Sequence, residues 1–326
     1  MDEKLLEIKG LSVHYVVEDE TVKALTDINL TLNKKETLGL VGETGAGKTT
    51  LALSIMKLVP DPPGRIIGGE IIFEGEDLIK KNNEEMRKIR GRKISMIFQD
   101  PMTSLNPVLT VGDQIAEVIL LHNKISKAES KKRAVEILES VGIPGERCNE
   151  YPHQFSGGMK QRVVIAIALA CNPELLLADE PTTALDVTIQ AQILNLMQKL
   201  QEKMGTSTIL ITHDLGVVAE ICDKVAIIYA GEIVEYGTLE HIFNNPKHPY
   251  TLGLFGSLPN LDKDVERLNP IPGMMPDPSN LPVGCSFCER CSSAFSECEK
   301  CKPNVFEIEP GHLVKCHKFA KEANNG

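Results

Sequence analysis

A glycine-rich loop between a short apolar stretch and a helical pattern constrains the fold of this chain more than any other feature. Residues 42–49 are Gly-Glu-Thr-Gly-Ala-Gly-Lys-Thr, which fills every fixed position of the phosphate-loop pattern G-x-x-x-x-G-K-[ST]. Thr37–Val41 before the loop is predicted to be a strand, and Leu51–Val59 after it to be a helix. A strand, a loop and a helix in this order predict an α/β fold built on a mainly parallel sheet.

The loop residues have the chemistry that a bound triphosphate requires. Glycines allow backbone N–H groups to turn toward a phosphate, and the N-terminus of the next helix attracts the anion. The Lys48 ammonium can reach the β- and γ-phosphates, and the Thr49 hydroxyl can bind Mg²⁺. The motif therefore predicts a site for a nucleoside triphosphate and does not say what the energy is used for. The nucleotide is assigned to Gly42, Gly45, Gly47, Lys48, Thr49 and Thr50.

Two carboxylates follow a fully apolar stretch farther along the chain. Leu175–Ala178 is predicted to be a buried strand, and Asp179 and Glu180 come directly after it. In a phosphate-loop fold a carboxylate at a strand end holds Mg²⁺, which suits Asp179. Glu180 lies one residue on and can act as general base on the attacking water. The alternative is that both carboxylates only end the strand in solvent.

A second candidate anion site precedes the helical pattern that begins at Val163. Ser156 is a good helix N-cap, and Gly157 and Gly158 follow it in the run Phe-Ser-Gly-Gly-Met-Lys-Gln-Arg over residues 155–162. One phosphate loop is enough to bind one nucleotide. A second helix N-terminus suited to phosphate therefore suggests that it serves a nucleotide held by another subunit.

With these motifs the chain resembles the ATP-binding cassette (ABC) family from about residue 5 to residue 255. Residues 155–161 resemble the signature motif of that family, with Phe155 and Met159 where Leu and Gln are commonest. Four further features lie in the expected order around the phosphate loop. Tyr15 resembles the adenine-stacking aromatic, and Gln99 resembles the glutamine loop that senses Mg²⁺ and the transport partner. The Ala184–Asp186 loop, with Asp186, resembles the loop that crosses the dimer interface, and His213 resembles the switch histidine.

The resemblance implies a fold and a mechanism. The fold is an ABC-type phosphate-loop NTPase core with a helical subdomain, and two such cassettes meet head to tail around two ATP molecules. Thr49, Gln99 and Asp179 would hold Mg²⁺ in one subunit. Glu180, His213 and Gln99 would carry catalysis, opposite the signature motif of the other subunit. The second subunit is a copy of this chain or a paralogue, and the pair drives two transmembrane permease subunits.

Further stretches narrow the resemblance to the dipeptide/oligopeptide (and nickel) importer ATPases. These stretches are residues 99–107, 180–190 and 245–251, together with parts of the tail from Ile271 to residue 317. The implied substrate is a short peptide that an extracytoplasmic peptide-binding protein delivers, so this chain would never touch it. The alternatives are a nickel-importer ATPase of the same group and a soluble ABC ATPase that acts on nucleic acid.

Composition and hydropathy limit the partners and the location. The net charge is −10 and aromatic residues make up 4% of the chain, which argues against a nucleic-acid partner. The longest apolar run, Val163–Cys171, is about half of the roughly 18–20 residues that cross a bilayer. The first ten residues are charged and lack the apolar core of a signal peptide. We expect a peripheral protein on the cytoplasmic face of the cell membrane.

The amino-acid composition of the chain changes near residue 259. The predicted domains are an ABC cassette over residues 1–258, with a helical subdomain at about 100–165, and a C-terminal part over 259–326. That part begins with a proline-rich stretch, which predicts an extended connector, and continues into a cysteine-rich tail. Its prolines are Pro259, Pro270, Pro272, Pro276, Pro278 and Pro282.

Six of the nine cysteines lie in this tail, which predicts a small metal-binding domain in a reducing compartment. Cys285-x₂-Cys288 with Cys298-x₂-Cys301 is typical of a zinc site, whereas Cys285-x₂-Cys288-x₂-Cys291 is typical of the start of a bacterial ferredoxin run. Structural disulfides are a third reading. The cysteine pattern of the importer group instead matches four cysteines of this chain. In some members of the group this set holds a [4Fe–4S] cluster, and we favour this cluster over Zn²⁺. The four are Cys285, Cys291, Cys298 and Cys316.

Overall fold

The computed structural model describes residues 3–18, 20–183, 185–257 and 270–320, and the chain forms two compact units. The first unit comprises Met1–Leu6, Leu32–Thr37 and Phe73–Thr212, and the second comprises Glu7–Thr31, Leu38–Ile72 and His213–Gly326. Both units therefore combine segments that are distant in the sequence. Each contains part of the predicted nucleotide chemistry.

The first unit is built on three parallel strands. Strand β7 (Leu175–Asp179) pairs with β6 (Ile94–Ile97) on one side and with β8 (Ser207–Thr212) on the other. Every residue of the three strands is buried, which explains why they are nearly continuous apolar runs in the sequence. The predicted parallel α/β core is confirmed in this unit.

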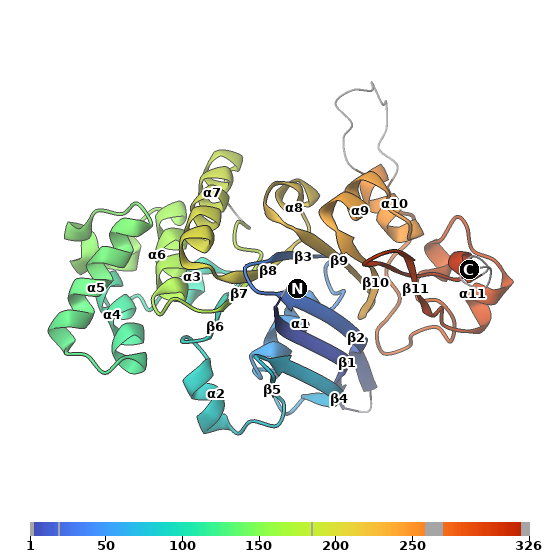
Figure 1. The fold of residues 1–326 in the computed structure, drawn as a ribbon, viewed down its shortest axis with the longest axis horizontal. Helices are drawn as coiled ribbons and strands as arrows, with labels where there is room; N and C mark the ends of the chain where they lie inside the picture. Colours follow the sequence, from blue (N-terminus) through green and yellow to red (C-terminus); the bar gives the residue numbers. More distant parts are fainter. Residues whose placement is uncertain (1–2, 19, 184, 258–269, 321–326) are drawn as a thin grey trace. The chain divides into compact units, whose positions relative to one another are not determined.

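Helices make up most of the rest of the first unit, and Figure 1 shows α4, α5 and α6 clustered together. Helix α5 is amphipathic: it buries Ala134 and Leu138 and begins at the N-cap Ser126. The remaining elements are β5 (Glu76–Asp77), α2 (Asn83–Ile89), α3 (Pro101–Ser104), α4 (Val111–His122), α5 (Lys127–Ser140), η1 (Gly145–Asn149), η2 (Pro152–Gln154), α6 (Gly157–Leu169) and α7 (Val187–Met204).

The second unit contains a mixed sheet in the order β11-β12-β10-β9-β3. β3 (Thr37–Val41) and β9 (Lys224–Tyr229) are parallel, and β10 (Glu232–Thr238) returns antiparallel to β9. The tail adds the antiparallel pair β11 (Val305–Glu309) and β12 (His312–Lys315) beyond β10. The C-terminal segment thus continues a sheet of the cassette and does not form a sheet of its own.

Long strands and short helices complete the second unit. β2 (Glu20–Asn33), β1 (Lys4–Val17) and β4 (Gly64–Phe73) are neighbours in another sheet. The helices are α1 (Lys48–Ile55), α8 (Leu215–Ile221), α9 (Leu239–Asn244), α10 (Pro249–Gly256), η3 (Cys288–Arg290), α11 (Ser296–Lys300) and η4 (His317–Phe319).

The predicted elements differ from the structure mainly at their ends. The helix predicted over Leu51–Val59 is wrong at both ends, because α1 starts at Lys48 and stops at Ile55. It stops there since Lys57 adopts φ 50°, in the left-handed region that breaks a helix. Within the predicted helical subdomain, α4 and α5 are two separate helices, with residues 123–126 between them.

The predicted domain boundary stays a prediction, because residues 258–269 lie outside the described chain. Within residues 100–165 the structure has α3, α4, α5 and the first part of α6. The described part of the connector, residues 270–284, forms turns and neither helix nor strand. Throughout the described ranges, every helix is too short or too polar to span a bilayer.

Candidate functional site

The phosphate loop connects β3 to α1 in the second unit, and two glycines are required by its geometry. A Cβ atom on Gly42 would lie 2.2 Å from the Ile228 carbonyl oxygen, so no side chain fits where the loop leaves β3. Gly47 is the N-cap of α1 and adopts φ 103°, a conformation that favours glycine. The sequence pattern therefore reflects backbone constraints as well as chemistry.

Lys48 points back into this loop. Its side chain is buried, and its ammonium donates to the Gly42 carbonyl oxygen at 2.7 Å and to that of Glu43 at 3.0 Å. A cation held inside a ring of backbone groups is suited to binding phosphate. Thr49 is exposed in the first turn of α1, and Thr50 follows it with its carbonyl oxygen accepting from Ser54 Oγ at 2.6 Å.

Two further predicted residues lie in the same unit. Tyr15 is half-buried near the end of β1, and its Cε1 atom would lie 2.7 Å from a Cβ atom on Gly64. The tyrosine ring therefore packs against the backbone at the start of β4. His213 is exposed, next to Asp214, which caps α8 by accepting from Gly216 N at 2.8 Å.

The two carboxylates at the end of β7, Asp179 and Glu180, differ in their surroundings within the first unit. Asp179 ends the strand and is 2% exposed, whereas Glu180 is half-buried and adopts φ 46°. The left-handed backbone turns Glu180 away from the strand direction at a cost of about 1 kcal/mol. Its Oε2 accepts from Gln99 Nε2 at 3.0 Å and from Thr183 Oγ1 at 2.9 Å.

The structure thus brings together two residues that the sequence analysis selected separately, Gln99 and Glu180. It also adds Thr183, which the sequence analysis did not select although it lies in the Glu-Pro-Thr-Thr run that carried the resemblance. Two donors on one carboxylate oxygen fix its direction. A carboxylate held in a fixed direction at a strand end suits a general base.

The signature motif and the loop before α7 meet in the first unit. Ser156 caps α6 by accepting from Met159 N, and Asp186 caps α7 by accepting from Ile189 N at 3.0 Å. A Cβ atom on Gly158 would lie 2.7 Å from Ile189 Cγ2, so the N-termini of the two helices are close. A Cβ atom on Gly157 would meet its nearest neighbour, Leu185 Cδ2, at 3.9 Å. Ala184, in the predicted dimer loop, lies outside the described residues.

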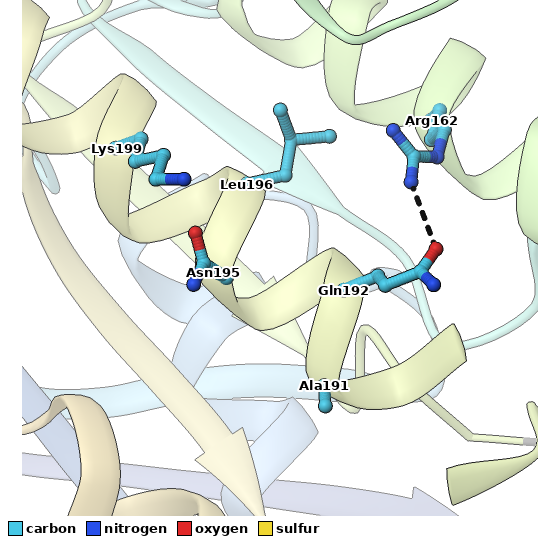
Figure 2. A pocket seen from close by; sticks show the side chains of 6 residues that line it. All are labelled: Arg162, Ala191, Gln192, Asn195, Leu196 and Lys199. Carbon is cyan, nitrogen blue, oxygen red and sulfur yellow. Dashed lines mark hydrogen bonds between the residues drawn. The ribbon is translucent and has the colours of Figure 1, made fainter. Parts of the chain in front are cut away.

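Side chains of α6 and α7 line a groove, and Figure 2 shows these side chains. Its volume is about 470 Å³. Arg162 on α6 donates to Gln192 Oε1 on α7 at 3.3 Å, and Lys199 adds a second cation. None of the six described side chains that line it is a carboxylate or a nucleophile, so we assign no catalytic role to this groove.

Five of the six tail cysteines line a single small cavity of about 20 Å³ in the second unit. Four of them are the predicted cluster ligands, and the cavity also contacts His248 and His317. Cys301 is exposed and does not line the cavity, and its Sγ atom lies 3.9 Å from His317 Nε2. The five cysteines are Cys285, Cys288, Cys291, Cys298 and Cys316.

Burial disfavours the ionised form of three of these thiols. Burial raises the pKa of Cys285 to about 11, with smaller contributions from neighbouring thiols, and burial also raises the pKa of Cys291 and Cys316. Among the described residues, no three His, Cys, Asp or Glu side chains are arranged to hold one metal ion. The predicted metal centre is therefore not found.

Models of known protein families match the part of the chain that contains the phosphate loop and the part that leads into the tail. Residues 25–183 match the family model described as ABC transporter, and residues 234–298 match the one described as oligopeptide/dipeptide transporter, C-terminal region. The chain is 55% identical to the oligopeptide transport ATP-binding protein OppD of Bacillus subtilis, over 96% of this chain and 88% of that protein. It is 50% identical to the dipeptide transport ATP-binding protein DppD of the same organism, over 96% and 94%.

A solved structure is similar too. The dimeric, post-hydrolysis ATP-binding cassette MJ0796 bound to ADP and Pi matches with a TM-score of 0.65 and 31% identity, over 72% of this chain and 98% of that one. The fold and site define an ATP-hydrolysing ABC cassette. The chain belongs to the ATP-binding proteins of the oligopeptide/dipeptide ABC transporter family.

Proposed function

We propose that this chain is the ATP-hydrolysing subunit that energises import of dipeptides or oligopeptides through separate membrane subunits. The observation that carries the proposal is the extent of the similarity. The relatives named for peptide transport are about 50% identical to the chain over nearly its full length, and a peptide-transporter model matches its C-terminal region. The substrate assignment comes from these relatives, because no part of the described site is suited to a peptide rather than a nucleotide.

We propose a division of labour among the site residues that follows from the resemblance of their motifs to those of ABC cassettes. Lys48 binds the β- and γ-phosphates from inside the loop, and Thr49 and Asp179 hold Mg²⁺, with Gln99 contacting the ion as well. Glu180 takes a proton from the attacking water while Gln99 and Thr183 hold its carboxylate in place.

The remaining residues act around this centre. His213 contacts the γ-phosphate, and Tyr15 stacks on adenine. The signature residues of a second ATPase subunit complete the site, with Asp186 at the dimer interface. Helix α6 begins directly after Ser156, so its N-terminal N–H groups are available to a phosphate of that neighbour. The chain lies on the cytoplasmic face of the membrane, where it assembles with two transmembrane permeases and meets the peptide-binding protein only indirectly.

Replacing the proposed base tests the catalytic assignment. Glu180→Gln keeps the side-chain size and removes the proton acceptor, so ATP turnover should fall at least about 100-fold while an ATP-bound dimer accumulates. The control is Glu202→Gln on the exposed face of α7, which should leave turnover unchanged. Wild-type turnover by Glu180→Gln would exclude Glu180 as the base.

Reconstitution with the membrane subunits tests the substrate. Peptide-loaded binding protein should stimulate ATP hydrolysis, and nickel-loaded binding protein should not. Stimulation by nickel alone would replace the peptide assignment with the nickel alternative. Tight, salt-sensitive binding of the chain to nucleic acid at physiological salt would favour the third candidate.

We further propose that Cys285, Cys291, Cys298 and Cys316 hold a [4Fe–4S] cluster, with Zn²⁺ as the alternative. All four line one cavity, and soft thiolates suit either group. Burial raises the pKa values of Cys285, Cys291 and Cys316, so a bound cation would have to compensate the charge of their thiolates. The bound group would supply cross-links within a short segment that has few apolar residues of its own.

Anaerobic purification with visible absorbance and with iron, sulfide and zinc analysis tests this assignment. Cys316→Ser should remove the iron, and Cys301→Ser should retain it because Cys301 lies outside the cavity. A colourless protein with one zinc per chain would select the alternative. A protein with neither metal would contradict both.

A further inference from the structure

An ion pair joins the phosphate loop to the cysteine-rich tail within the second unit. Arg290 lies between Cys288 and Cys291 in the tail, and its Nη1 atom donates to both carboxylate oxygens of Glu43 at 3.0 Å. Glu43 is the first variable residue of the loop, and 247 positions separate the two residues. The established chemistry of the loop does not explain this contact, because Glu43 is not one of its phosphate-binding positions.

Arg290 is fixed on several sides. Its side chain is 7% exposed, its Nε atom donates to the Pro272 carbonyl oxygen at 2.9 Å, and its Nη1 atom also reaches the Tyr229 hydroxyl at 3.3 Å. The guanidinium carbon lies 5.7 Å from the centre of the Tyr229 ring and 6.0 Å from that of Phe287. A guanidinium held this firmly loses little entropy when it pairs with a carboxylate.

Glu43 is in turn fixed through both its backbone and its side chain. Its N–H donates to the hydroxyl of the fully buried Tyr250 at 3.1 Å, and its carbonyl oxygen accepts from the Lys48 ammonium. A change in the position of Glu43 would therefore shift an anchor of the phosphate-binding lysine. The connector lies close as well, since Met275 Cε would be 3.3 Å from a Cβ atom on Gly45.

The charge of Glu43 makes its pairing important for the nucleotide. Its carboxylate is part of a loop that binds a triphosphate, and an unpaired negative charge there repels the ligand. Arg290 neutralises this charge from a buried position, whereas the Glu43 side chain is 32% exposed, so water would screen the repulsion only in part without Arg290.

We propose that Arg290 is a positioning residue for nucleotide binding, which acts through Glu43 on the phosphate loop. The affinity for ATP then depends on the folded cysteine-rich tail. This inference rests on the ATPase class of the chain and is independent of the transported substrate and of any metal group in the tail.

Three variants of the full chain test the pair: Arg290→Met, Glu43→Gln and the double variant. ATP dissociation constants come from titration with a fluorescent ATP analogue, and KM and kcat from steady-state hydrolysis. Arg290→Met should raise the dissociation constant and KM roughly tenfold and change kcat less than about twofold. Glu43→Gln alone should bind ATP at least as tightly as the wild type, because it removes the repulsive charge.

The double variant separates positioning from a general effect on folding. If Arg290 acts by neutralising Glu43, adding Glu43→Gln to Arg290→Met should restore ATP affinity to within about threefold of the wild type. The matched control is Lys302→Met, which removes an ion pair of the same tail with Glu232 and leaves Glu43 untouched. Its ATP affinity should equal that of the wild type.

Two results would overturn the proposal. One is an Arg290→Met protein that melts cooperatively and binds ATP within about twofold of the wild type. The other is a loss of affinity that Glu43→Gln does not relieve and that Lys302→Met reproduces. In that case the tail would affect the loop only by stabilising the fold.

Discussion

The phosphate loop and the cysteine-rich segment, residues 285–320, are held in place in opposite ways. The loop is fixed by backbone geometry over a few consecutive residues, with no room for a side chain at Gly42 and a left-handed backbone at Gly47. The segment is fixed by side chains that pair with acidic residues far away in the sequence. Local and distant constraints therefore govern two parts of the same unit.

The contacts of the segment with β10 show this dependence on distant partners. Glu232 is buried and accepts from Lys302 Nζ at 3.0 Å, from Lys315 Nζ at 2.9 Å and from Ser286 Oγ at 3.0 Å. Glu235 is also buried and lies 2.8 Å from His312 Nε2. Buried charges are tolerated only when they are paired, so each removed partner leaves an uncompensated group.

The difference predicts that substitutions in the two regions have separable effects. A change in the loop chemistry should alter ATP turnover and leave the segment folded. A change in an acidic anchor should lower stability first. Arg290 is an exception to this separation, because its ion pair with Glu43 connects the segment to the loop.

The largest effect is expected from Lys48→Ala. The substitution removes the cation that binds the transferred phosphate, so ATP turnover should fall about 1000-fold. The thermal unfolding midpoint should change by less than about 3 °C, because the lysine ammonium donates to two carbonyl oxygens of its own loop, those of Gly42 and Glu43. Steady-state hydrolysis and calorimetry measure the two effects. A large loss of stability would show that loop and segment are less separable than their contacts suggest.

Gly42→Ala tests the backbone constraint by itself. The added methyl group would overlap the Ile228 carbonyl oxygen, so the loop must move away from β9, with a loss of about 3 kcal/mol in the free energy of unfolding. Gly68→Ala is the matched control, since nothing lies within 4 Å of its Cβ position. Denaturant titration of both variants gives the comparison. Equal stability of the two proteins would mean that the loop is more adaptable than its geometry implies.

The same contrast explains what the sequence could and could not predict. Lys48, Asp179 and Glu180 could be predicted as site residues because their proposed chemistry follows from neighbours within a few residues of a strand end or a loop. Thr183 was missed although it is close in sequence, because its role requires knowing where the Glu180 carboxylate points. Arg290 and Glu43 could not be paired, since no periodicity or motif relates positions so distant in the chain.

Strands were missed for a related reason. β12 is four residues long and includes the polar pair His312 and Lys315, so alternation gives almost no signal. It is a strand because β10 and β11 flank it on both sides. The predicted metal centre stays a prediction: cysteine spacing identified side chains that line one cavity, and among the described residues no group is arranged to hold a metal ion.

Glu232→Gln should destabilise the segment directly. The amide retains the shape and leaves Lys302 and Lys315 without an anionic partner in a largely buried site, which should cost about 2 kcal/mol. Glu299→Gln, at an exposed position of α11, should change stability by less than about 0.5 kcal/mol. Both values come from urea unfolding at neutral pH. ATP affinity should be unaffected in either variant, and a parallel loss of affinity would contradict the separation of the two regions.

The smallest effect on stability is expected from a fall in pH, which protonates the carboxylate of Glu232. Burial raises the pKa of Glu232, but Lys315 and then Lys302 outweigh burial and hold its pKa below the ordinary value of 4.5. The unfolded chain therefore binds a proton more readily than the folded one, and stability rises with pH across this window. The contribution of Glu232 is present above about pH 4.5 and is lost as the pH falls through the lowered pKa of the folded protein. Urea unfolding of the wild type and of Glu232→Gln between neutral and acid pH measures the difference, which should shrink as the pH falls. A constant difference would show that the two lysines do not act on Glu232 through charge.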